Sequence, residues 1–436
     1  MTVRRALFAA RLIDGTGGPV QDDPVLILNG DRIEEVTSAD AWKRRAGSDP
    51  VEELHYPGAT LTPGLIDGHV HLALSGADEA DEVLAEFMDA GEVRLVAMAG
   101  ENARRCLASG VTTVRDCGGP GTMITELRDA IAAGVMVGPR VLSSGMPITT
   151  TGGHCHFFGR IADSEPEVRT AVRSLIRDDV DLIKVMATGG RLTPNSAMLQ
   201  PQYSPRELVA LVEEATRLGR PVAAHVLSTE GIRRCVAAGV RTLEHCMWQD
   251  EDGRYAIDDA TLERIRQDGT FVSLTVVGTM RTAWRAYRED PAGAPLPAAL
   301  ATRFAVEAEM IRRGVAYFVT SDAGVPACRF DEFPFSLAVA TEWLGLTPID
   351  AIAAATSKAA RALGIDDWVG TLEAGKDADV LVVDGDPSDD VLALRDVRAV
   401  FQRGALRVVD GRVATAPSRR RYQRPAPTVR RTRRSA

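Results

Sequence analysis

The 436-residue sequence lacks any long run of apolar residues, and this lack argues against a helix that crosses a membrane. Such a helix needs about 20 consecutive apolar residues. A short apolar patch near the N-terminus is interrupted by Arg11 and Asp14, so it fits a strand better than a signal peptide. We therefore expect a cytoplasmic protein without a membrane partner.

Cysteine is scarce, and it is never spaced as a paired motif. Six cysteines are scattered along the chain, and none belongs to a CxxC pair. In a long chain without an export signal, such cysteines are expected to be reduced rather than bridged. Cys155 and Cys246 each neighbour a histidine, and we interpret both as small buried apolar residues.

Acidic residues are absent from the C-terminal segment 417–436, which contains eight arginines. The whole chain has a formal net charge of −9, so the remainder carries about −17. A basic segment with prolines and no apolar periodicity is typical of a disordered tail. No base-stacking module accompanies this tail, so we expect no nucleic-acid partner.

The middle of the chain alternates short apolar runs with amphipathic segments, which is the repeat of a parallel α/β sheet. With the run that contains His69, we count eight candidate strands up to Asp322. The other seven runs are residues 110–116, 139–145, 180–190, 220–226, 240–246, 269–275 and 315–324. Eight repeats favour a closed (β/α)8 TIM barrel over an open doubly wound sheet.

Both ends of the chain have a different style, with short strands joined by Gly and Asp turns. They cover residues 1–60 and 369–416. Two all-β ends around an α/β middle predict one small β-sandwich domain built from both termini. The predicted barrel then spans 61–368, and the disordered tail spans 417–436.

One helix is predicted together with both of its ends. Ser204 can cap it, Pro205 takes the first helical position, and Glu207 completes a capping box. Gly219 ends the helix.

Histidine is also rare, with seven residues, and six of them fall near the ends of candidate strands. His55 lies outside the predicted barrel. In the run LTPGLIDGHVHL at 61–72, His69 and His71 share one face of a strand because side chains alternate. Two adjacent imidazoles on a buried strand would repel each other if protonated, whereas a metal ion accepts both as neutral ligands.

The polar residues at the strand ends follow a definite order along the chain. They are His69, His71, Lys184, His225, His245 and Asp322. Together with GTLEAGKDADVLVVD at 370–384, this order resembles the metal-dependent amidohydrolase superfamily over nearly the whole chain. Taken singly, each histidine can be a core residue, Asp322 a helix cap, and Lys184 a side chain that snorkels to the barrel mouth.

The resemblance implies a centre with two divalent metal ions, for which zinc is the expected metal. His69, His71 and Asp322 would hold the more buried ion, and His225 and His245 the other. Lys184 would carry a carbamate derived from carbon dioxide and bridge both ions, which turns a costly buried ammonium into a carboxylate-like ligand. The two ions would lower the pKa of a bridging water from 15.7 towards roughly 7, giving a hydroxide. Asp322 would be the catalytic residue that moves the proton to the leaving amine.

Two further runs, TTGGHCHFFG and GVTTVRDCGG, resemble the imidazolonepropionase-related group, which includes prolidases, other Xaa-amino-acid carboxydipeptidases and hydrolases of N-acyl amino acids. His154 and His156 share one face if their segment is extended, and both are candidates to bind substrate. Tyr203 and Arg191 are candidates to bind a free α-carboxylate. An equally open interpretation makes Arg191 a solvated loop charge.

The resulting prediction is a binuclear amidohydrolase that cleaves the amide bond of a dipeptide or an N-acyl amino acid. The alternatives are a hydrolase of cyclic amides, lactams or carbamate-type xenobiotics, a mononuclear deaminase, and a non-catalytic scaffold. The Lys184 strand argues against the deaminase, and the six competent ligand positions argue against the scaffold. We expect a homo-oligomer.

Overall fold

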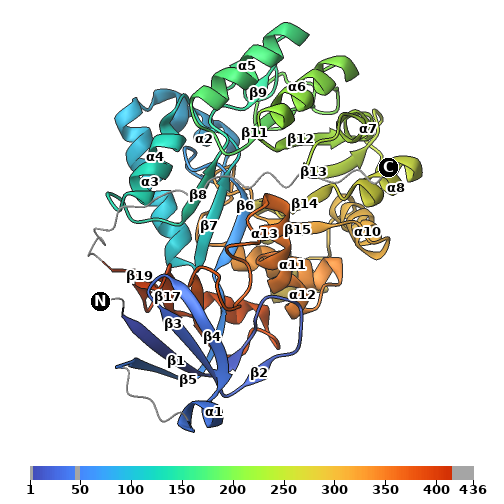
Figure 1. The fold of residues 1–436 in the computed structure, drawn as a ribbon. Coiled ribbons are helices and arrows are strands. Elements are labelled where there is room, and N and C mark those ends of the chain that lie inside the picture. The colour runs from blue at the N-terminus through green and yellow to red at the C-terminus, as the bar shows by residue number, and fades with distance from the viewer. Residues whose placement is uncertain (1–2, 45–49, 415–436) are drawn as a thin grey trace, which may run out of the picture.

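The computed structural model describes residues 3–44 and 50–414, so the predicted tail 417–436 lies outside the described residues. Two parts are visible in Figure 1: a part in which strands alternate with helices, and a smaller part made of strands. The second part contains strands from both ends of the chain, as the sequence predicts.

Hydrogen bonds join the terminal strands into one nine-stranded sheet. Its N-terminal members are β1 (Arg4–Leu12), β2 (Gln21–Asp22), β3 (Pro24–Asn29), β4 (Arg32–Ser38) and β5 (Glu52–Pro63), with the short helix α1 (Ala39–Lys43) after β4. The C-terminal members are β16 (Val380–Asp384), β17 (Val397–Gln402), β18 (Ala405–Val409) and β19 (Arg412–Val413), with the 3-10 helix η1 (Val391–Arg395) after β16. The order is β19-β18-β17-β16-β5-β1-β3-β4, and β2 pairs with β1. The predicted sandwich is therefore one continuous ladder rather than two separately bonded sheets.

Strand β16 links this sheet to the rest of the molecule. Val380 and Val382 belong to the core of the sheet domain, while Leu381 and Val383 belong to the large core of the α/β part. Because side chains alternate along a strand, one four-residue apolar run can serve two cores.

The α/β part contains eight parallel strands that follow the predicted runs. They are β6 (Leu65–Val70), β7 (Val111–Asp116), β8 (Arg140–Ser143), β11 (Ile183–Met186), β12 (Val222–Ser228), β13 (Thr242–Gln249), β14 (Phe271–Thr275) and β15 (Tyr317–Thr320). The short strand β9 (Ile148–Thr149) pairs with β11, and β10 (Arg160–Ile161) pairs with β9. The ladder has two pieces, β6-β7-β8 and β10-β9-β11-β12-β13-β14-β15. The arrangement is a TIM-barrel-like α/β fold.

Two contacts connect the pieces of the ladder. The backbone N–H of Asp181 donates to the carbonyl of Ser143 at 2.8 Å, an ordinary length for such a hydrogen bond. On the other side, Val70 forms an isolated parallel bridge with Ala323. The first contact joins the end of β8 to the segment before β11, and the second brings the ends of β6 and β15 together.

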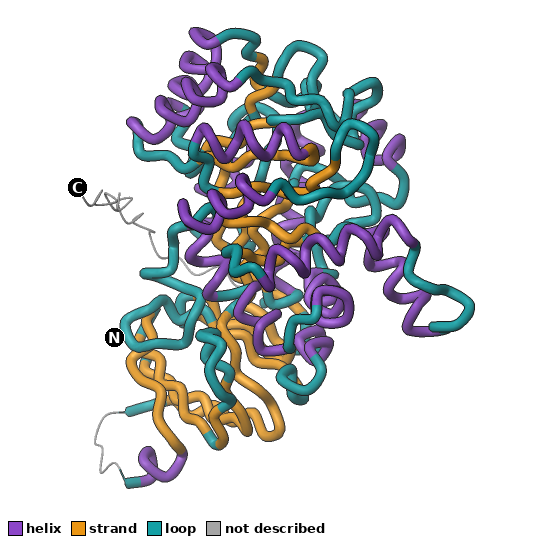
Figure 2. The backbone as a smooth tube through the Cα atoms, turned by 90° about the vertical axis from the view of Figure 1, so that its right-hand side faces the viewer, coloured by secondary structure: helices purple, strands orange, loops and turns teal. Residues whose placement is uncertain are grey.

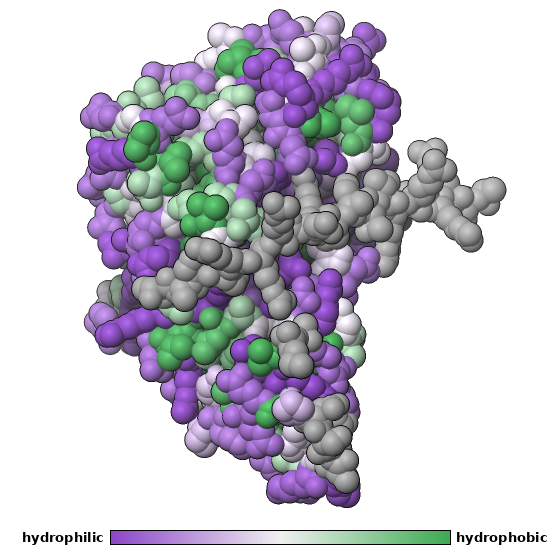
Figure 3. Space-filling model, turned by 60° about the vertical axis from the view of Figure 1, so that its left-hand side comes forward, coloured by the Kyte–Doolittle hydropathy of each residue, from purple (hydrophilic) through white to green (hydrophobic). Residues whose placement is uncertain are grey.

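Helices cover the outside of this strand system, as Figures 1 and 2 show. They are α2 (Ala80–Asp89), α3 (Glu92–Ala108), α4 (Met123–Ala132), α5 (Glu165–Arg177), α6 (Pro205–Arg217), α7 (Thr229–Ala238), α8 (Asp259–Asp268), α9 (Gly278–Glu289), α10 (Ala298–Arg312), α11 (Phe333–Leu344), α12 (Pro348–Ala354) and α13 (Ser357–Leu363). In the described ranges, each helix is too short or too polar to cross a bilayer. The face in Figure 3 is mostly hydrophilic, with separate apolar spots.

The helix with predicted ends is confirmed. Both hydrogen bonds of the capping box between Ser204 and Glu207 are present, and Pro205 is the first residue of α6. Gly219 follows the helix with a φ of +74°, a conformation that glycine adopts without strain.

The motif LTPGLIDGHVHL divides between two elements. Residues 61–63 end β5 of the sheet domain, and β6 begins at Leu65. Gly64 lies between them with its Cα against Thr112, where a Cβ would come within 2.2 Å of that side chain. The change from sheet domain to barrel strand therefore occurs a few residues later than predicted.

Candidate metal centre

The carboxyl ends of the barrel strands bring the six predicted ligand residues together. His69 lies in β6 and His71 directly follows it, while Asp322 follows β15 by two residues. The remaining three are Lys184 in β11, His225 in β12 and His245 in β13. All six side chains are buried.

Three of these residues converge on one point. Oδ1 of Asp322 lies 3.4 Å from Nε2 of His69 and 3.5 Å from Nε2 of His71. Within the described residues, this oxygen has no hydrogen-bond partner. Two imidazole nitrogens and one carboxylate oxygen that face each other in a buried space suit a divalent cation.

His225 and His245 form the second half of the cluster. Their ring centroids lie 4.8 Å apart, and the ring of His245 lies 5.1 Å from that of His69. Nε2 of His225 lies 3.0 Å from the carbonyl oxygen of Gly189. A ring that donates Nε2–H to a carbonyl keeps its Nδ1 lone pair for a metal ion.

Lys184 lies in the middle of the cluster. Its side chain is fully buried, and within the described ranges Nζ has no hydrogen-bond partner. An ammonium group without partners is costly in a protein interior. An uncharged or carboxylated nitrogen beside metal ions removes that cost, so the residues present fit the centre that the sequence predicts.

Burial keeps three of the four histidines, His69, His225 and His245, in the neutral form. Burial and the neighbouring Lys184 lower the pKa of His69 to about 4. Burial lowers the pKa values of His225 and His245 well below the usual range. Burial would raise the pKa of Asp322, but the surrounding imidazoles of His69, His71 and His245 hold it well below its usual range. Neutral imidazoles beside an ionised carboxylate are the forms that bind metal ions.

Several residues of the centre have backbone conformations that are rare for residues other than glycine. His245 has a φ of +68° and Asp322 a φ of +56°. Thr242 and Glu244 of β13 face the barrel interior, so regular alternation would turn His245 away from it. The left-handed backbone at His245 lets two consecutive residues reach the same interior. Such strain is typical of functional sites.

Two carboxylates near the ligands were missed by the sequence prediction. Oε2 of Glu244 lies 3.1 Å from Nδ1 of His69. Asp67 accepts hydrogen bonds from the backbone N–H groups of His69 and Ser321, at 3.3 and 3.2 Å. The available signals were that Glu244 precedes His245 and that Asp67 precedes His69 by two residues on the same strand face.

Among the predicted substrate residues, His154 joins the cluster. Its ring centroid lies 4.6 Å from that of His225, and its Nδ1 lies 3.0 Å from Oγ1 of Thr193. Burial and Lys184 lower its pKa to about 3. The ring packs on the backbone of Gly190, where a Cβ would come within 2.3 Å of Nε2.

His156 does not share this position, because residues 151–159 form turns rather than an extended segment. Cys155, between the two histidines, has a left-handed φ of +56°, which separates the directions of the two rings. His156 is exposed, and its Nδ1 lies 3.0 Å from the carbonyl of Gly153.

The two candidate carboxylate partners lie in different surroundings. Tyr203 is 1% exposed, and its hydroxyl has no hydrogen-bond partner within residues 3–44 and 50–414. Burial, followed by the charges of Asp163 and Glu207, raises the pKa of Tyr203. Arg191 is exposed on the loop beyond Gly190.

The predicted state of the cysteines is confirmed for all six residues. Each is buried and free of disulfide bonds. Cys155 and Cys246 pack in the large apolar core.

Comparison with known proteins agrees with the geometry. Residues 60–412 match the sequence profile of the amidohydrolase family. The chain is 29% identical to the ochratoxinase of Aspergillus niger over 426 residues, which cover 90% of this chain and 84% of the relative. It is 25% identical to the imidazolonepropionase of Mesorhizobium japonicum over 412 residues, covering 88% and 92%.

A solved structure described as a Xaa-Pro dipeptidase with bound methionine in its active site is also similar. It superposes with a TM-score of 0.78 at 26% identity, covering 92% of this chain and 99% of the other. These findings confirm the resemblance inferred from the HxH, Lys, His, His, Asp order and from the runs around His154. The chain therefore belongs to the amidohydrolase family, whose members hydrolyse carbon–nitrogen bonds.

Proposed function

We propose that this protein is a binuclear metal-dependent amidohydrolase that cleaves the amide bond of a dipeptide or an N-acyl amino acid. The observation that carries the proposal is the buried convergence of His69, His71 and Asp322, with the unpartnered Lys184 beside them. The names of the relatives, an ochratoxinase and a Xaa-Pro dipeptidase, support this substrate class.

In this proposal, His69, His71 and Asp322 hold one ion, and His225 and His245 hold the other. Lys184, as a carbamate, would be the ligand that the two ions share, and zinc is the expected metal. When bound, such ions lower the pKa of a water molecule and polarise the carbonyl of the substrate. The closed eight-stranded barrel belongs to the same proposal, supported by the Val70–Ala323 bridge.

The residues of the chain supply the proton transfer. Asp322 is ionised at neutral pH, because its pKa lies well below its usual range. Its carboxylate can accept the proton of the attacking water and pass it to the nitrogen of the leaving amine. Hydrolysis then yields a free acid and a free amine.

Substrate binding is assigned to residues on the loops around the cluster. His154 is neutral, and its Nε2 is available beside Gly190 for the carbonyl or carboxylate of a substrate. Arg191 and Tyr203 are the proposed partners of a free α-carboxylate, and exposed His156 is confined to the rim. We also propose that the protein is cytoplasmic and forms a homo-oligomer.

A release assay on metal-analysed protein tests this function. The panel contains Xaa-amino-acid dipeptides and N-acyl amino acids, each beside its C-terminal amide. We expect turnover of the free acids and loss of turnover on amidation, because only the free acid offers a carboxylate anchor. Equal turnover of acid and amide contradicts the anchor, and turnover of lactams or carbamates alone favours the alternative substrate class.

The role of Lys184 as a shared ligand has its own test. Lys184→Ala should reduce kcat/KM at least about a hundredfold and reduce the bound metal, because a shared ligand is lost. Full activity and metal content in this variant would exclude a bridging role for Lys184.

A further inference from the structure

A buried polar network lies beneath His69, on the side opposite Asp322. Arg115 of β7 donates from Nη2 to Oε1 of Glu244 at 2.6 Å, and from Nε to the carbonyl of Gly68 at 2.6 Å. Its Nη1 donates to Oγ1 of Thr242 at 2.9 Å, and the Thr242 hydroxyl donates to Oε1 of Glu244 at 2.6 Å. Glu244 is fully buried, and Arg115 and Thr242 are nearly so.

The two oxygens of Glu244 face different groups. Oε1 accepts from Arg115 and Thr242, whereas Oε2 faces Nδ1 of His69 at 3.1 Å. A carboxylate oxygen 3.1 Å from Nδ1 of His69 favours the tautomer with its proton on Nδ1, which leaves the lone pair on Nε2, the nitrogen that faces Asp322.

His69 is distinguished from the other oriented ligands by this partner. Nδ1 of His71 lies 3.1 Å from the carbonyl of Gly118, and Nε2 of His225 lies 3.0 Å from the carbonyl of Gly189. A carboxylate partner increases the basicity of the imidazole more than a neutral carbonyl does. This increase in basicity concerns the ion that His69, His71 and Asp322 would hold.

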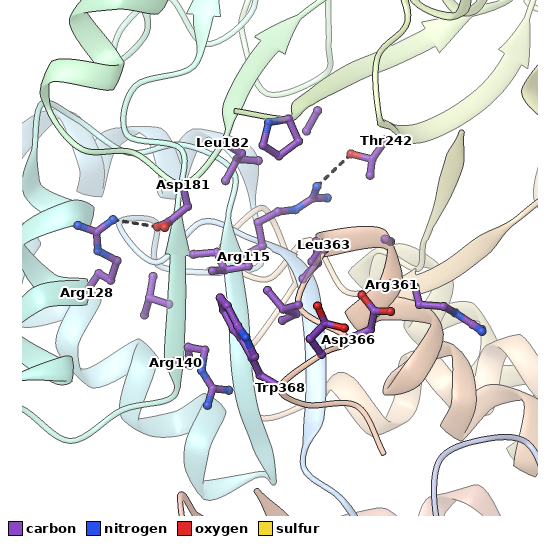
Figure 4. A pocket seen from close by; sticks show the side chains of 18 of the residues that line it. Arg115, Arg128, Arg140, Asp181, Leu182, Thr242, Arg361, Leu363, Asp366 and Trp368 are labelled. Carbon is purple, nitrogen blue, oxygen red and sulfur yellow. Dashed lines mark hydrogen bonds and ion pairs between the residues drawn. The ribbon is translucent and has the colours of Figure 1, made fainter. Parts of the chain in front are cut away.

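The network also lies away from the substrate side. Arg115 and Thr242 are among the residues that line a cavity of about 1930 Å³ at the base of the barrel. Figure 4 labels both of them. Substrate enters such barrels from the opposite, carboxyl end of the strands. Glu244 therefore acts through His69 and not by touching substrate.

We propose that Glu244, held by Arg115 and Thr242, is a positioning residue that fixes the tautomer and orientation of His69 for metal binding. This inference rests on the proposed function, because it needs an ion at His69, His71 and Asp322. Loss of an outer-shell partner of a metal-binding histidine typically weakens metal affinity 10- to 100-fold.

The test is equilibrium competition for zinc between the protein and a chelator, with Glu244→Gln compared with the wild type. The substitution keeps the shape of the side chain but removes its charge. We expect two ions in the wild type, and a dissociation constant about 10- to 100-fold higher for one of the two in the variant. The second ion should be bound as in the wild type.

Glu214→Gln is the matched control. Glu214 of α6 is also a buried carboxylate, and it accepts hydrogen bonds from Arg173 and Arg217 without contacting a residue of the cluster. Thermal unfolding should show a loss of stability in both variants, but only Glu244→Gln should lose metal affinity. If Glu214→Gln weakens metal binding as much as Glu244→Gln does, the loss is a consequence of general destabilisation and the inference is overturned.

Thr242→Val keeps the inference testable if Glu244→Gln does not fold. It removes one hydrogen bond to Oε1 and the acceptor of Nη1 of Arg115, while the hydrogen bonds from Arg115 to Glu244 and Gly68 remain, so we expect a rise of about threefold in the zinc dissociation constant. Unchanged zinc affinity in a folded Glu244→Gln or Thr242→Val variant overturns this inference but not the proposed function. A wild type that binds no zinc overturns the proposed function as well.

Discussion

Single buried histidines explain much of the chemistry of this centre. His69 and His154 are nearly inaccessible to solvent, and both lie near Lys184. Burial opposes protonation, so both rings remain neutral far below the pH at which a solvated histidine is charged. A neutral imidazole can bind a metal ion or form a hydrogen bond. Both rings therefore have the required protonation state before an ion or a substrate binds.

This protonation behaviour predicts a pH dependence of stability. An unfolded histidine titrates near pH 6.5, whereas His69 and His154 in the folded protein have pKa values of about 4 and 3. As the pH falls below about 6.5, the unfolded chain binds protons that the folded chain does not bind. The free energy of unfolding should therefore fall with pH, by up to about 1.4 kcal/mol per pH unit for each histidine, and should be independent of these groups above pH 6.5.

Urea unfolding of metal-free protein between pH 7.5 and pH 4.5 measures this slope. His154→Gln should have a shallower slope than the wild type. His55→Gln is the matched control, because the side chain of His55 is 60% exposed and lies in β5 of the sheet domain. If His154→Gln has the same slope as the wild type, the low pKa of His154 in the folded protein is contradicted.

At the scale of elements, the loops after the strands decide which side chains reach the centre. The loop after β11 contributes the carbonyl of Gly189, which orients His225, and the backbone of Gly190, on which His154 rests. The absence of a Cβ at Gly190 is therefore a requirement of the site. This explains why a glycine is found at position 190.

Gly190→Ala tests this requirement. A Cβ at this position would lie 2.3 Å from Nε2 of His154, so the ring must move. We expect kcat/KM to fall about a hundredfold, because a displacement of about 1 Å in a catalytic site has an effect of that size. The steady-state kinetics of the preferred substrate measure the loss.

Gly91→Ala is the comparison. Gly91 precedes α3 with a φ of −72°, and no other atom lies within 4 Å of the place that an added Cβ would take. This variant should have wild-type kinetics. If Gly190→Ala retains full activity, His154 is not needed where the structure has it.

At the scale of the whole molecule, the sheet domain and the α/β part share strand β16. Leu381 and Val383 pack in the core of the α/β part, while Val380 and Val382 pack in the sheet domain. Gly110 lies directly against Leu381 at the start of β7, where a Cβ would come within 2.8 Å of the leucine. The two parts are therefore expected to unfold together.

Leu381→Ala tests this coupling. Removal of a fully buried leucine should lower the free energy of unfolding by about 2–5 kcal/mol, with one cooperative transition. Chemical denaturation followed by both circular dichroism and tryptophan fluorescence measures it. Val409→Ala, at a position that is 45% exposed, should change stability by less than about 0.5 kcal/mol. Two separate transitions would mean that the parts are independent.

The sequence by itself determined the residue types of the centre, the β-then-α order and the limits of α6. These features depend on periodicity and on hydrogen bonds within a few residues, such as those between Ser204 and Glu207. The tertiary structure decided the rest. Glu244 reaches Arg115 across 129 residues of sequence, the backbone at His245 reverses the strand alternation, and a left-handed Cys155 directs His156 to solvent. These arrangements depend on how distant strands and turns pack, which local patterns along the chain do not encode.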